Sequence, residues 1–464
     1  MQRLLAIALL TVKAAFRYRL VVVLSVLLLG TVIGLPLIIK HDGSARGFTQ
    51  ILMTYTLSLI TTLLGFATLW LACGTMARDV EECQMQMVAV KPIARWQIWL
   101  GKWVGIMMLN AMLLGVSAVA VFGIMQWRAR HLPPEQQEVL RNEVLVARGS
   151  LKEPQPDIQK DVELNLKERL KKAPVMQLDL PLLRNQITEQ VKWQYQLVPP
   201  GYLRKWVINL GFRKNFLKDQ PLYLRVKFHT PETRDAAEPK TSISYDAFWE
   251  IGPPDSPLRR RNAMRLSPAT FHEFQIPPNM FDANGDLTIS FINQNETVLL
   301  FPLDEGMEVL YREGSFGLNF SRGIGIIFCW LGLLAALGLT AASFLSFPVA
   351  SFFALGFLIV GLSSSTLSTV VQEGGIFGVN HEGGPSAPNF ADKILVPIFQ
   401  VLLKLVNLVQ GFSPIDSLSL GRSITWEQLG LAIAQIVLLM GGIMAAIGIV
   451  IFTRRELATA QSNN

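Results

Sequence analysis

The sequence predicts a polytopic α-helical membrane protein with six transmembrane helices, interfacial helices and an inserted extracytoplasmic α+β domain containing an antiparallel β-sandwich. Three observations lead to this fold class. Several long stretches carry no charged residue, and only 17 % of the residues are charged, against about 25 % in an average soluble domain. The mean hydropathy is +0.35. One long polar segment, residues 128–322, interrupts the apolar pattern. A buried soluble core is disfavoured because soluble helices seldom lack a polar face.

The membrane-spanning segments are predicted from length. A helix needs about 20 consecutive apolar residues to cross a bilayer. The uncharged stretches that reach this length are Leu20–Ile39, Gly47–Ala77, Val104–Trp127, Gly323–Gln372 and Gln428–Thr453. The fourth of them is long enough for two spans, and Ser343–Pro348 offers the turn between these two. The sequence therefore predicts six spans.

Basic residues predict the orientation of these spans. They lie before the first span, between the second and third, and after the last: Arg3, Lys13, Arg17, Arg19, Arg78, Lys91, Arg95, Lys102, Arg454 and Arg455. With six spans these three regions share one side, which the positive-inside rule makes cytoplasmic. The expected location is the inner or plasma membrane of a bacterial cell, with both termini cytoplasmic. The net charge of +7 partly reports this topology, and without a nucleic-acid motif no nucleic-acid partner is expected.

The N-terminal segment is predicted to lie in the inner membrane interface as an amphipathic helix. Its polar residues share about one third of the helix circumference: Gln2, Arg3, Lys13 and Arg17. The alternative is an extended start to the first span.

A second amphipathic helix is predicted on the outer membrane surface at residues 390–412. Its polar residues form one stripe: Lys393, Gln400, Lys404, Asn407 and Gln410. A seventh span here would bury Lys404 in the membrane, at a cost of about 2.5–3.5 kcal/mol or more.

Residues 128–322 are predicted to form an extracytoplasmic domain, between a first membrane part at residues 1–127 and a second at residues 323–464. Its first portion, residues 128–212, has a helical pattern, with helices expected at Glu135–Arg148, Lys160–Lys172 and Leu180–Val198. In residues 220–315, apolar and polar residues alternate in short runs: Leu222–His229, Ile243–Ile251, Leu287–Phe291, Val298–Phe301 and Glu308–Arg312. Alternating runs separated by turn residues are typical of an antiparallel β-sandwich.

Catalytic and metal-binding chemistry is not expected. Asp282, Asn284 and Asp286 resemble the first ligands of a calcium loop, but Asn293 stands where the motif needs Glu, so an Asn284-Gly285 turn is the better interpretation. The histidines lack HExxH or CxxC partners. The three cysteines lie in or beside apolar segments and are expected to be buried hydrophobic residues. We therefore expect no enzyme activity, no metal and no cofactor.

The loop at residues 74–102 is predicted to form a docking surface for a cytoplasmic partner. Its acidic residues suit a helix N-terminus, and Pro92 ends that first helix. Ile93, Trp96 and Trp99 recur at helical spacing and predict a second amphipathic helix that runs into the third span. Two short helices with acids and exposed methionines suit a partner's groove. The alternative is a charged loop between two spans.

Three segments give this chain a resemblance to the type-2 exporter permeases of ATP-binding-cassette transporters. They are Ala77–Glu81 together with Lys91–Lys102 in the loop, Ser346–Ala350 in the turn between spans four and five, and Phe452–Ala458 near the end. The resemblance covers residues 1–127 and 323–464. Cys83–Met85 replaces a frequent Gly-Thr-Leu, and the large insertion is not a general family feature.

The resemblance implies a permease subunit that pairs with a second permease subunit in the lipid bilayer. Its loop at residues 74–102 would be a coupling loop that docks on a separate cytoplasmic P-loop ATPase, because this chain has no GxxxxGK[ST] motif. The residues expected to make the docking contacts are Arg78, Asp79, Glu81, Glu82, Met85, Met87, Lys91 and Arg95.

The sparse polarity of the spans favours export of a lipid-like substrate, or mechanical work on an external protein partner. The alternative function is a membrane-anchored binding or assembly protein whose β-sandwich captures a partner without transport.

Overall fold

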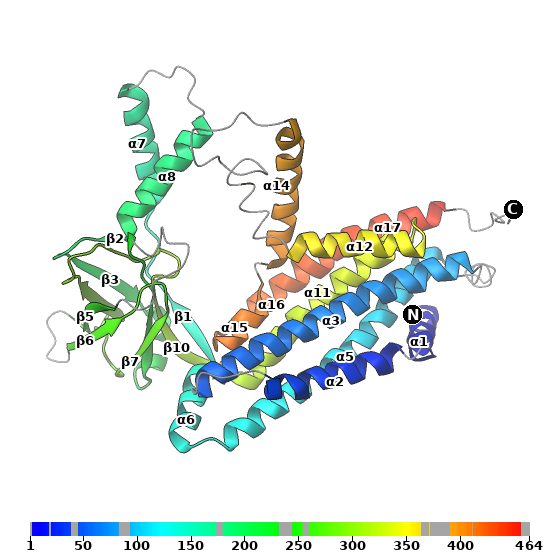
Figure 1. Cartoon of the computed structure of the whole chain (residues 1–464), viewed down its shortest axis with the longest axis horizontal. Helices are drawn as coiled ribbons and strands as arrows, with labels where there is room; N and C mark the ends of the chain where they lie inside the picture. Colours follow the sequence, from blue (N-terminus) through cyan, green and yellow to red (C-terminus); the bar gives the residue numbers. More distant parts are fainter. Residues whose placement is uncertain are drawn as a thin grey trace. The chain divides into compact units, whose positions relative to one another are not determined.

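The computed structural model describes residues 2–17, 20–38, 45–82, 93–172, 180–231, 244–253, 259–362, 371, 390–410 and 412–455. The chain divides into two compact units. The helical unit comprises Met1–Ala147 and Gly314–Asn464, and the β-unit comprises Arg148–Glu313. Figure 1 shows the long helices of the first unit and the sheets of the second.

The helical unit is built from long apolar helices and short connecting ones. In chain order these are α1 (Gln2–Arg17), α2 (Leu20–Ile38), α3 (Ala45–Glu81), α5 (Arg95–Arg130), α6 (Pro134–Val139), the π-helix η1 (Leu140–Val144), α11 (Phe316–Ala342), α12 (Phe347–Leu362), α14 (Phe390–Gln410), α15 (Pro414–Ser419), α16 (Trp426–Ala432), the π-helix η3 (Ile433–Gly441) and α17 (Gly442–Arg454). The helix predicted at residues 390–412 is thus present as α14.

Four of the described helices are long and apolar enough to cross a membrane: Thr49–Glu81, Arg95–Arg130, Phe316–Ala342 and Trp426–Arg454. The count rises to five if Gln2–Arg17 and Val22–Leu35, whose axes differ by 72°, form one bent span. The predicted six spans are more than these helices supply. The described part of α12 has 16 residues, which rise about 24 Å against a hydrocarbon core of about 30 Å.

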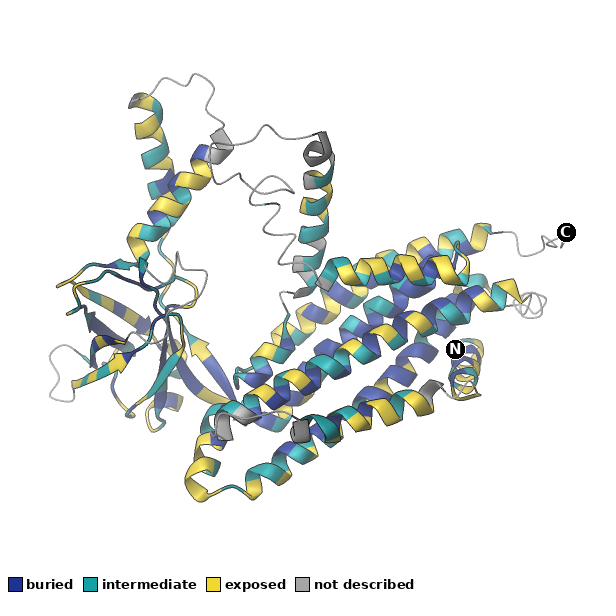
Figure 2. Cartoon of the chain, in the orientation of Figure 1, coloured by how far each residue is buried: buried dark blue, intermediate teal, exposed yellow. Residues whose placement is uncertain are grey.

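The outward faces of the helical unit are apolar. Val119 on α5 is 73 % exposed and Phe352 on α12 is 79 % exposed. Figure 2 shows such exposed positions along the same helices that bury their other face. The inner faces pack closely, and a Cβ at Gly338 of α11 would lie 2.7 Å from the Cβ of Ala72 on α3. Apolar side chains on both faces of a helix are typical of a helix in a membrane.

A tight crossing joins α1 to α5. The sequence Gly101–Gly105 is a GxxxG motif, which lets two helix backbones approach closely. A Cβ at Gly105 would lie 2.7 Å from the carbonyl oxygen of Ala8 and 2.8 Å from the Cβ of Thr11. The α1 residues on this face are buried: Ile7, Ala8, Thr11 and Ala15. Only this small-residue face of the predicted amphipathic helix is covered by α5, while Leu5, Leu9, Leu10 and Phe16 stay exposed, as do Lys13 and Arg17.

This crossing predicts that Gly105→Leu destabilises the helical unit by about 1–3 kcal/mol, because the new side chain must displace α1. Gly115→Leu is the matched control on the same helix, since nothing lies within 4 Å of its Cβ position. The melting temperature in detergent and the rate of tryptic cleavage at Lys13 and Arg17 measure the difference. Equal behaviour of the two variants would contradict the close α1–α5 packing.

The β-unit contains two four-stranded sheets and a helical hairpin. Its elements are β1 (Val146–Leu151), α7 (Ile158–Lys172), α8 (Leu180–Gln196), β2 (Leu197–Val198), β3 (Leu203–Asn209), the 3₁₀ turn η2 (Gly211–Arg213), α9 (Lys214–Leu217), β4 (Leu222–Val226), β5 (Tyr245–Ile251), β6 (Arg260–Leu266), β7 (His272–Ile276), β8 (Asp286–Ile292), β9 (Leu299–Leu300) and β10 (Met307–Ser315). The strand orders are β1-β10-β4-β7 and β3-β8-β5-β6, and β2 pairs with β9.

Both four-stranded sheets contribute to one apolar core. Trp249 of β5 lies 6.0 Å from Trp206 of β3 and 6.0 Å from Phe274 of β7, measured between ring centroids. The same core contains Leu224 of β4 and Val309 of β10, both fully buried. The strand pairs β4–β10, β4–β7, β3–β8, β5–β6 and β5–β8 are antiparallel, for example Trp206 opposite Ile289, as the alternation in residues 220–315 predicts.

Several strands were not predicted from the sequence. Residues 128–212 were expected to be helical, and α7 and α8 are, but β1 and β3 also lie there, and the helix predicted at Glu135–Arg148 ends at Val144. The first four residues of β1 are all buried, so that strand shows no alternation. The edge strand β6 is mostly exposed, so its sequence reads as a polar loop.

Four buried charges cross one sheet, one on each strand. Arg225 of β4 lies opposite Glu308 of β10 and opposite Glu273 of β7. Its Nη1 lies 3.4 Å from Glu308 Oε1, and Arg148 of β1 forms an ion pair with Glu273. Ser150 Oγ donates a hydrogen bond of 2.7 Å to Glu308 Oε2. All four charged side chains are less than 5 % exposed, so each depends on its partners for solvation.

Removing one member of this row should cost about 3–5 kcal/mol of unfolding free energy, because its partner is left buried and uncompensated. We expect this of Glu308→Leu, and Arg225→Met added to it should recover part of the loss. Asp246→Asn is the control, since its pair with Arg265 is exposed and worth at most about 1 kcal/mol. Hydrogen exchange of β4 and β8 amides measures the stability. No difference between Glu308→Leu and Asp246→Asn would contradict the argument.

Candidate functional site

The predicted docking loop connects the end of α3 to the start of α5. One buried lysine, Lys102, joins these two helices. Lys102 Nζ donates a hydrogen bond of 2.7 Å to the carbonyl oxygen of Thr75 and forms an ion pair with Asp79. The lysine side chain is only 7 % exposed. An acid in the last turn of a helix is opposed by the helix dipole. Lys102 offsets that charge, and its second hydrogen bond reaches a carbonyl oxygen one helical turn before Asp79.

The turn between α11 and α12 is fixed to the same end of α3 by Phe347. The ring of Phe347 lies edge-on to Trp70 at 5.1 Å, and the guanidinium of Arg78 lies 4.6 Å from the ring centroid. The backbone N–H of Phe347 donates a hydrogen bond of 2.9 Å to Glu81 Oε1. Pro348 follows in the first turn of α12, where its missing N–H costs nothing. Glu81 therefore serves as the acceptor for the start of α12.

A third set of contacts supplies hydrogen-bond donors to the carbonyl groups at the end of α17. Arg95, the first residue of α5, donates through Nη1 to the carbonyl oxygens of Phe452, Thr453 and Arg455, at 2.8, 2.9 and 2.7 Å. Arg455 in turn donates through Nη1 to the carbonyl oxygen of Ser343 at the end of α11, at 3.0 Å. The last carbonyls of a helix have no partner within the helix, and arginine supplies it here.

These contacts join five helix ends into what we call the helix-end cluster. Its members are Arg78, Asp79, Glu81, Arg95, Lys102, Phe347, Phe452 and Arg455. The ends of α3, α11 and α17 and the starts of α5 and α12 meet in it. In Figure 1 these ends lie on the same side of the helical unit.

The expected docking residues divide into three groups. Arg78, Asp79, Glu81 and Arg95 belong to the helix-end cluster and contact other helices of this chain. Glu82 is exposed and follows the last turn of α3, where its N–H donates to the carbonyl oxygen of Arg78 at 2.8 Å. Met85, Met87 and Lys91 lie outside the described residues.

One local expectation about the loop is wrong. Asp79 and Glu81 were expected near the start of a new helix, but they lie in the last turn of α3. Their charges are accommodated by Lys102 and by the start of α12 instead. The sequence analysis also did not single out Lys102, Phe347 and Arg455 as site residues. All three lie inside the segments that carry the family resemblance, and that position was the signal by which the sequence could have identified them as site residues.

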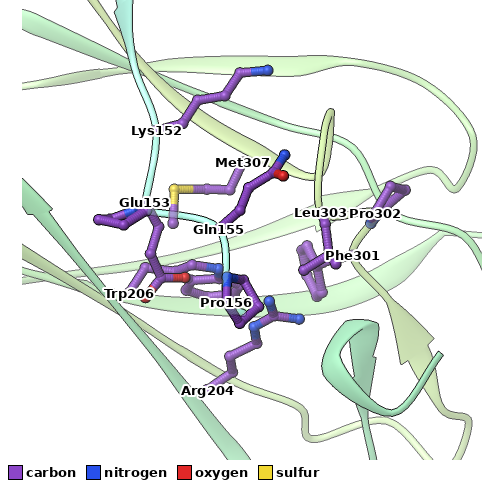
Figure 3. Close-up of a pocket in the computed structure, with 11 residues that line it drawn as sticks. Lys152, Glu153, Gln155, Pro156, Arg204, Trp206, Phe301, Pro302, Leu303 and Met307 are labelled. Atoms are coloured by element: carbon purple, nitrogen blue, oxygen red, sulfur yellow. The ribbon is translucent and has the colours of Figure 1, made fainter. Parts of the chain in front are cut away.

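A second candidate is a narrow groove in the β-unit (Figure 3). It lies between the segment after β1, with Glu153, and the face of β3 that carries Arg204 and Trp206. The guanidinium of Arg204 lies 4.8 Å from the Trp206 ring centroid. Burial lowers the pKa of Arg204, and burial raises the pKa of Glu153 despite the nearby arginine.

The groove leaves room for about one water molecule, whereas small-molecule sites measure about 300–1,000 Å³. Nη1 of Arg204 finds no hydrogen-bond partner among the residues the structure describes. The groove therefore suits a bound water better than a substrate.

Other chemistry-bearing residues are structural where they are described. Cys73 and Cys329 are free and buried, as expected, while Cys83 lies outside the described residues. Asp282 Oδ1 accepts the backbone N–H groups of Asn284 and Asp286, at 2.9 and 2.8 Å. This confirms the predicted turn at Gly285. Across the described ranges, no group of three or more His, Cys, Asp or Glu residues could hold a metal ion.

Comparisons with protein-family models, with curated proteins and with solved structures found no match to this chain.

The helix-end cluster predicts an asymmetry between the two ends of α5. Arg95→Met should lower stability by about 1.5–3 kcal/mol, the worth of hydrogen bonds to a charged group, and should expose Arg454 and Arg455 to trypsin. Arg95→Lys keeps a donor and should lose less. Arg130→Met, at the exposed opposite end of the helix, is the matched control. Melting temperature and tryptic cleavage measure these effects, and parity of Arg95→Met with Arg130→Met would refute the capping role.

Proposed function

We propose that this chain is the membrane-spanning permease subunit of an ATP-binding-cassette transporter of the type-2 exporter kind. One observation carries the proposal. The three segments that resemble that family are far apart in the sequence, yet Arg78, Phe347 and Arg455, one from each, belong to the same helix-end cluster. Residues that resemble a family only by accident have no reason to meet in space.

In this proposal α2 and α12 complete six spans, and the helix-end cluster faces the cytoplasm. The cluster and the nearby helix ends carry basic residues, including Arg78, Arg95, Arg454 and Arg455, as the positive-inside rule requires of that side. Two such subunits pair in the membrane. A separate P-loop ATPase binds each subunit at the coupling loop, residues 74–102, from Glu82 onward.

The cluster would transmit the ATPase movement to the membrane. A force on the coupling loop acts directly on the end of α3 and the start of α5. Because Glu81 at the end of α3 contacts Phe347 of α12, and Arg95 at the start of α5 contacts the end of α17, the same force moves those helices as well. The work of ATP hydrolysis then reaches the outer spans through a few hydrogen bonds and one aromatic contact.

The polar groups of the long helices favour an apolar substrate or a mechanical task. Thr68 Oγ1 donates to Asn110 Oδ1 at 3.0 Å within the bundle, while Asn110 Nδ2 and Thr61 Oγ1 are buried without a hydrogen-bond partner among the described residues. Thr56 Oγ1 and Ser117 Oγ donate to carbonyl oxygens of their own helices, at 2.6 and 2.9 Å. Groups that are satisfied inside the bundle do not line a path for a hydrophilic solute. We propose a lipid-like substrate, or mechanical work on an external protein partner through the β-unit.

A detergent pull-down from native membranes, with mass spectrometry of the co-purified proteins, tests the proposal. We expect a stoichiometric P-loop ATPase with the wild-type chain and at least a tenfold lower recovery with Glu82→Lys. Glu82 is the variant of choice because reversal at Glu81 would also remove the acceptor for α12. Glu135→Lys, an exposed charge reversal on α6, is the control and should recover the ATPase in full.

Two outcomes contradict the proposal. If no ATPase is recovered, the permease function fails. If, in addition, an external protein is recovered and is lost when residues 148–313 are deleted, a membrane-anchored binding protein becomes the better account.

A further inference from the structure

The β-unit presents two phenylalanines to solvent on one short turn. Phe212 in η2 is 87 % exposed, the largest exposed fraction among the large apolar side chains that the structure describes, and Phe216 in α9 is 56 % exposed. We call residues 211–218 the aromatic turn. Burying this apolar surface would be favourable, so its exposure in a soluble domain indicates an interaction surface.

The aromatic turn is held in place by its neighbours. Leu210 and Leu217, on either side of the phenylalanines, are buried in the sandwich core. The N–H of Gly211, whose φ is +55°, donates to Asn209 Oδ1 at 2.8 Å, and Lys214 Nζ donates to the carbonyl oxygen of Ala283 at 3.1 Å. With Leu217 in the core, the helical turn directs Phe216 outward. The exposure of the two rings is therefore imposed by the fold.

The charges of the aromatic turn indicate the kind of partner. Arg213, Lys214 and Lys218 stand beside the two rings, and Asp219 is the one acid that follows them directly. Phenylalanine rings combined with basic side chains match the interface of a bilayer that contains anionic lipids, where apolar side chains enter the boundary between headgroups and acyl chains and cations meet phosphates.

The position of the aromatic turn along the chain points to the same partner. The guanidinium of Arg213 lies 5.6 Å from the ring centroid of Tyr311 on β10. Only the segment 312–315 separates Tyr311 from Phe316, the first residue of α11. Five residue steps of fully extended chain cover at most about 18 Å. The turn therefore contacts a strand whose chain continues, five residues after Tyr311, into a candidate membrane span.

We propose that the aromatic turn inserts into the headgroup region of the bilayer that α11 crosses. Phe212 and Phe216 lie in the interface, and the basic side chains contact anionic headgroups. This inference rests on the membrane insertion put forward above and is independent of any ATPase.

Spin-label depth measurements on the full-length chain test the proposal. The background carries Cys73→Ala, Cys83→Ala and Cys329→Ala, and the protein is reconstituted in vesicles of equal parts phosphatidylcholine and phosphatidylglycerol. A nitroxide is placed at Phe212→Cys. Leu164→Cys on α7, an exposed site of the same unit, is the control for water, and Val119→Cys on α5 is the control for a span. The measured quantity is the ratio of oxygen to nickel-chelate accessibility.

We expect a ratio at position 212 several-fold above that at position 164. If position 119 reports lipid while position 212 matches position 164, the inference is wrong and membrane insertion stands. If position 119 also reports water, membrane insertion itself fails. A label at position 212 that is shielded from both reagents would show that protein, from this chain or a second copy, covers the turn, and this also overturns the inference.

A second reporter separates the rings from the label. With the nitroxide at Lys218→Cys, the double change Phe212→Ser and Phe216→Ser should lower the accessibility ratio toward that of water. Tyr202→Ser removes another exposed aromatic of the β-unit and should leave the ratio unchanged. An equal effect of both changes would mean that the phenylalanines do not anchor the turn.

Discussion

The helical unit depends on satisfying the ends of its helices. Within a helix the backbone is self-sufficient, but each end leaves several carbonyl or N–H groups without partners inside the helix. Arg95 does this at one place, because the two N–H groups of its Nη1 lie within hydrogen-bond distance of three carbonyl oxygens at the end of α17, with one N–H shared between two of them. At the start of α12 the unpaired group is a donor, and Glu81 accepts the N–H of Phe347 there. These two side chains satisfy helix ends that the packing of α5, α12 and α17 brings together.

The same contacts show that several charged residues of the predicted docking loop bind other helices of this chain. From the sequence, an acid-rich loop between two spans indicates a surface for a partner. In the structure Asp79 pairs with Lys102 and Arg78 covers Phe347, so half of the expected docking set holds the fold together. Docking and folding are compatible only if the partner approaches residues other than these, and Glu82 is the nearest exposed charge. A partner that binds Glu82 applies force next to Glu81, which accepts the N–H of Phe347 at the start of α12.

The spacing of apolar residues predicted those helices and strands whose burial follows a regular pattern along the chain. The apolar runs located the long helices, and the alternating runs located β4, β5, β8 and β10. Strand β1 could not be found this way, because Arg148 is buried by an ion pair with Glu273, which is distant in the sequence. The helix-end cluster could be predicted only as a set of motifs. Which carbonyls Arg95 meets is decided by the packing of α5 against α17, and the sequence of either helix alone carries no record of it.

A coupling device needs an element that can take two arrangements, and the contacts around Phe347 are weaker than those that Lys102 makes between α3 and α5. Lys102 is nearly fully buried and holds both an ion pair and a carbonyl, so releasing it would leave a buried charge uncompensated. Phe347 is held by one aromatic contact, one cation–π contact and one exposed hydrogen bond, each worth about 0.5–1.5 kcal/mol. If the ends of the bundle rearrange under load, the start of α12 should therefore separate from α3 before α3 separates from α5.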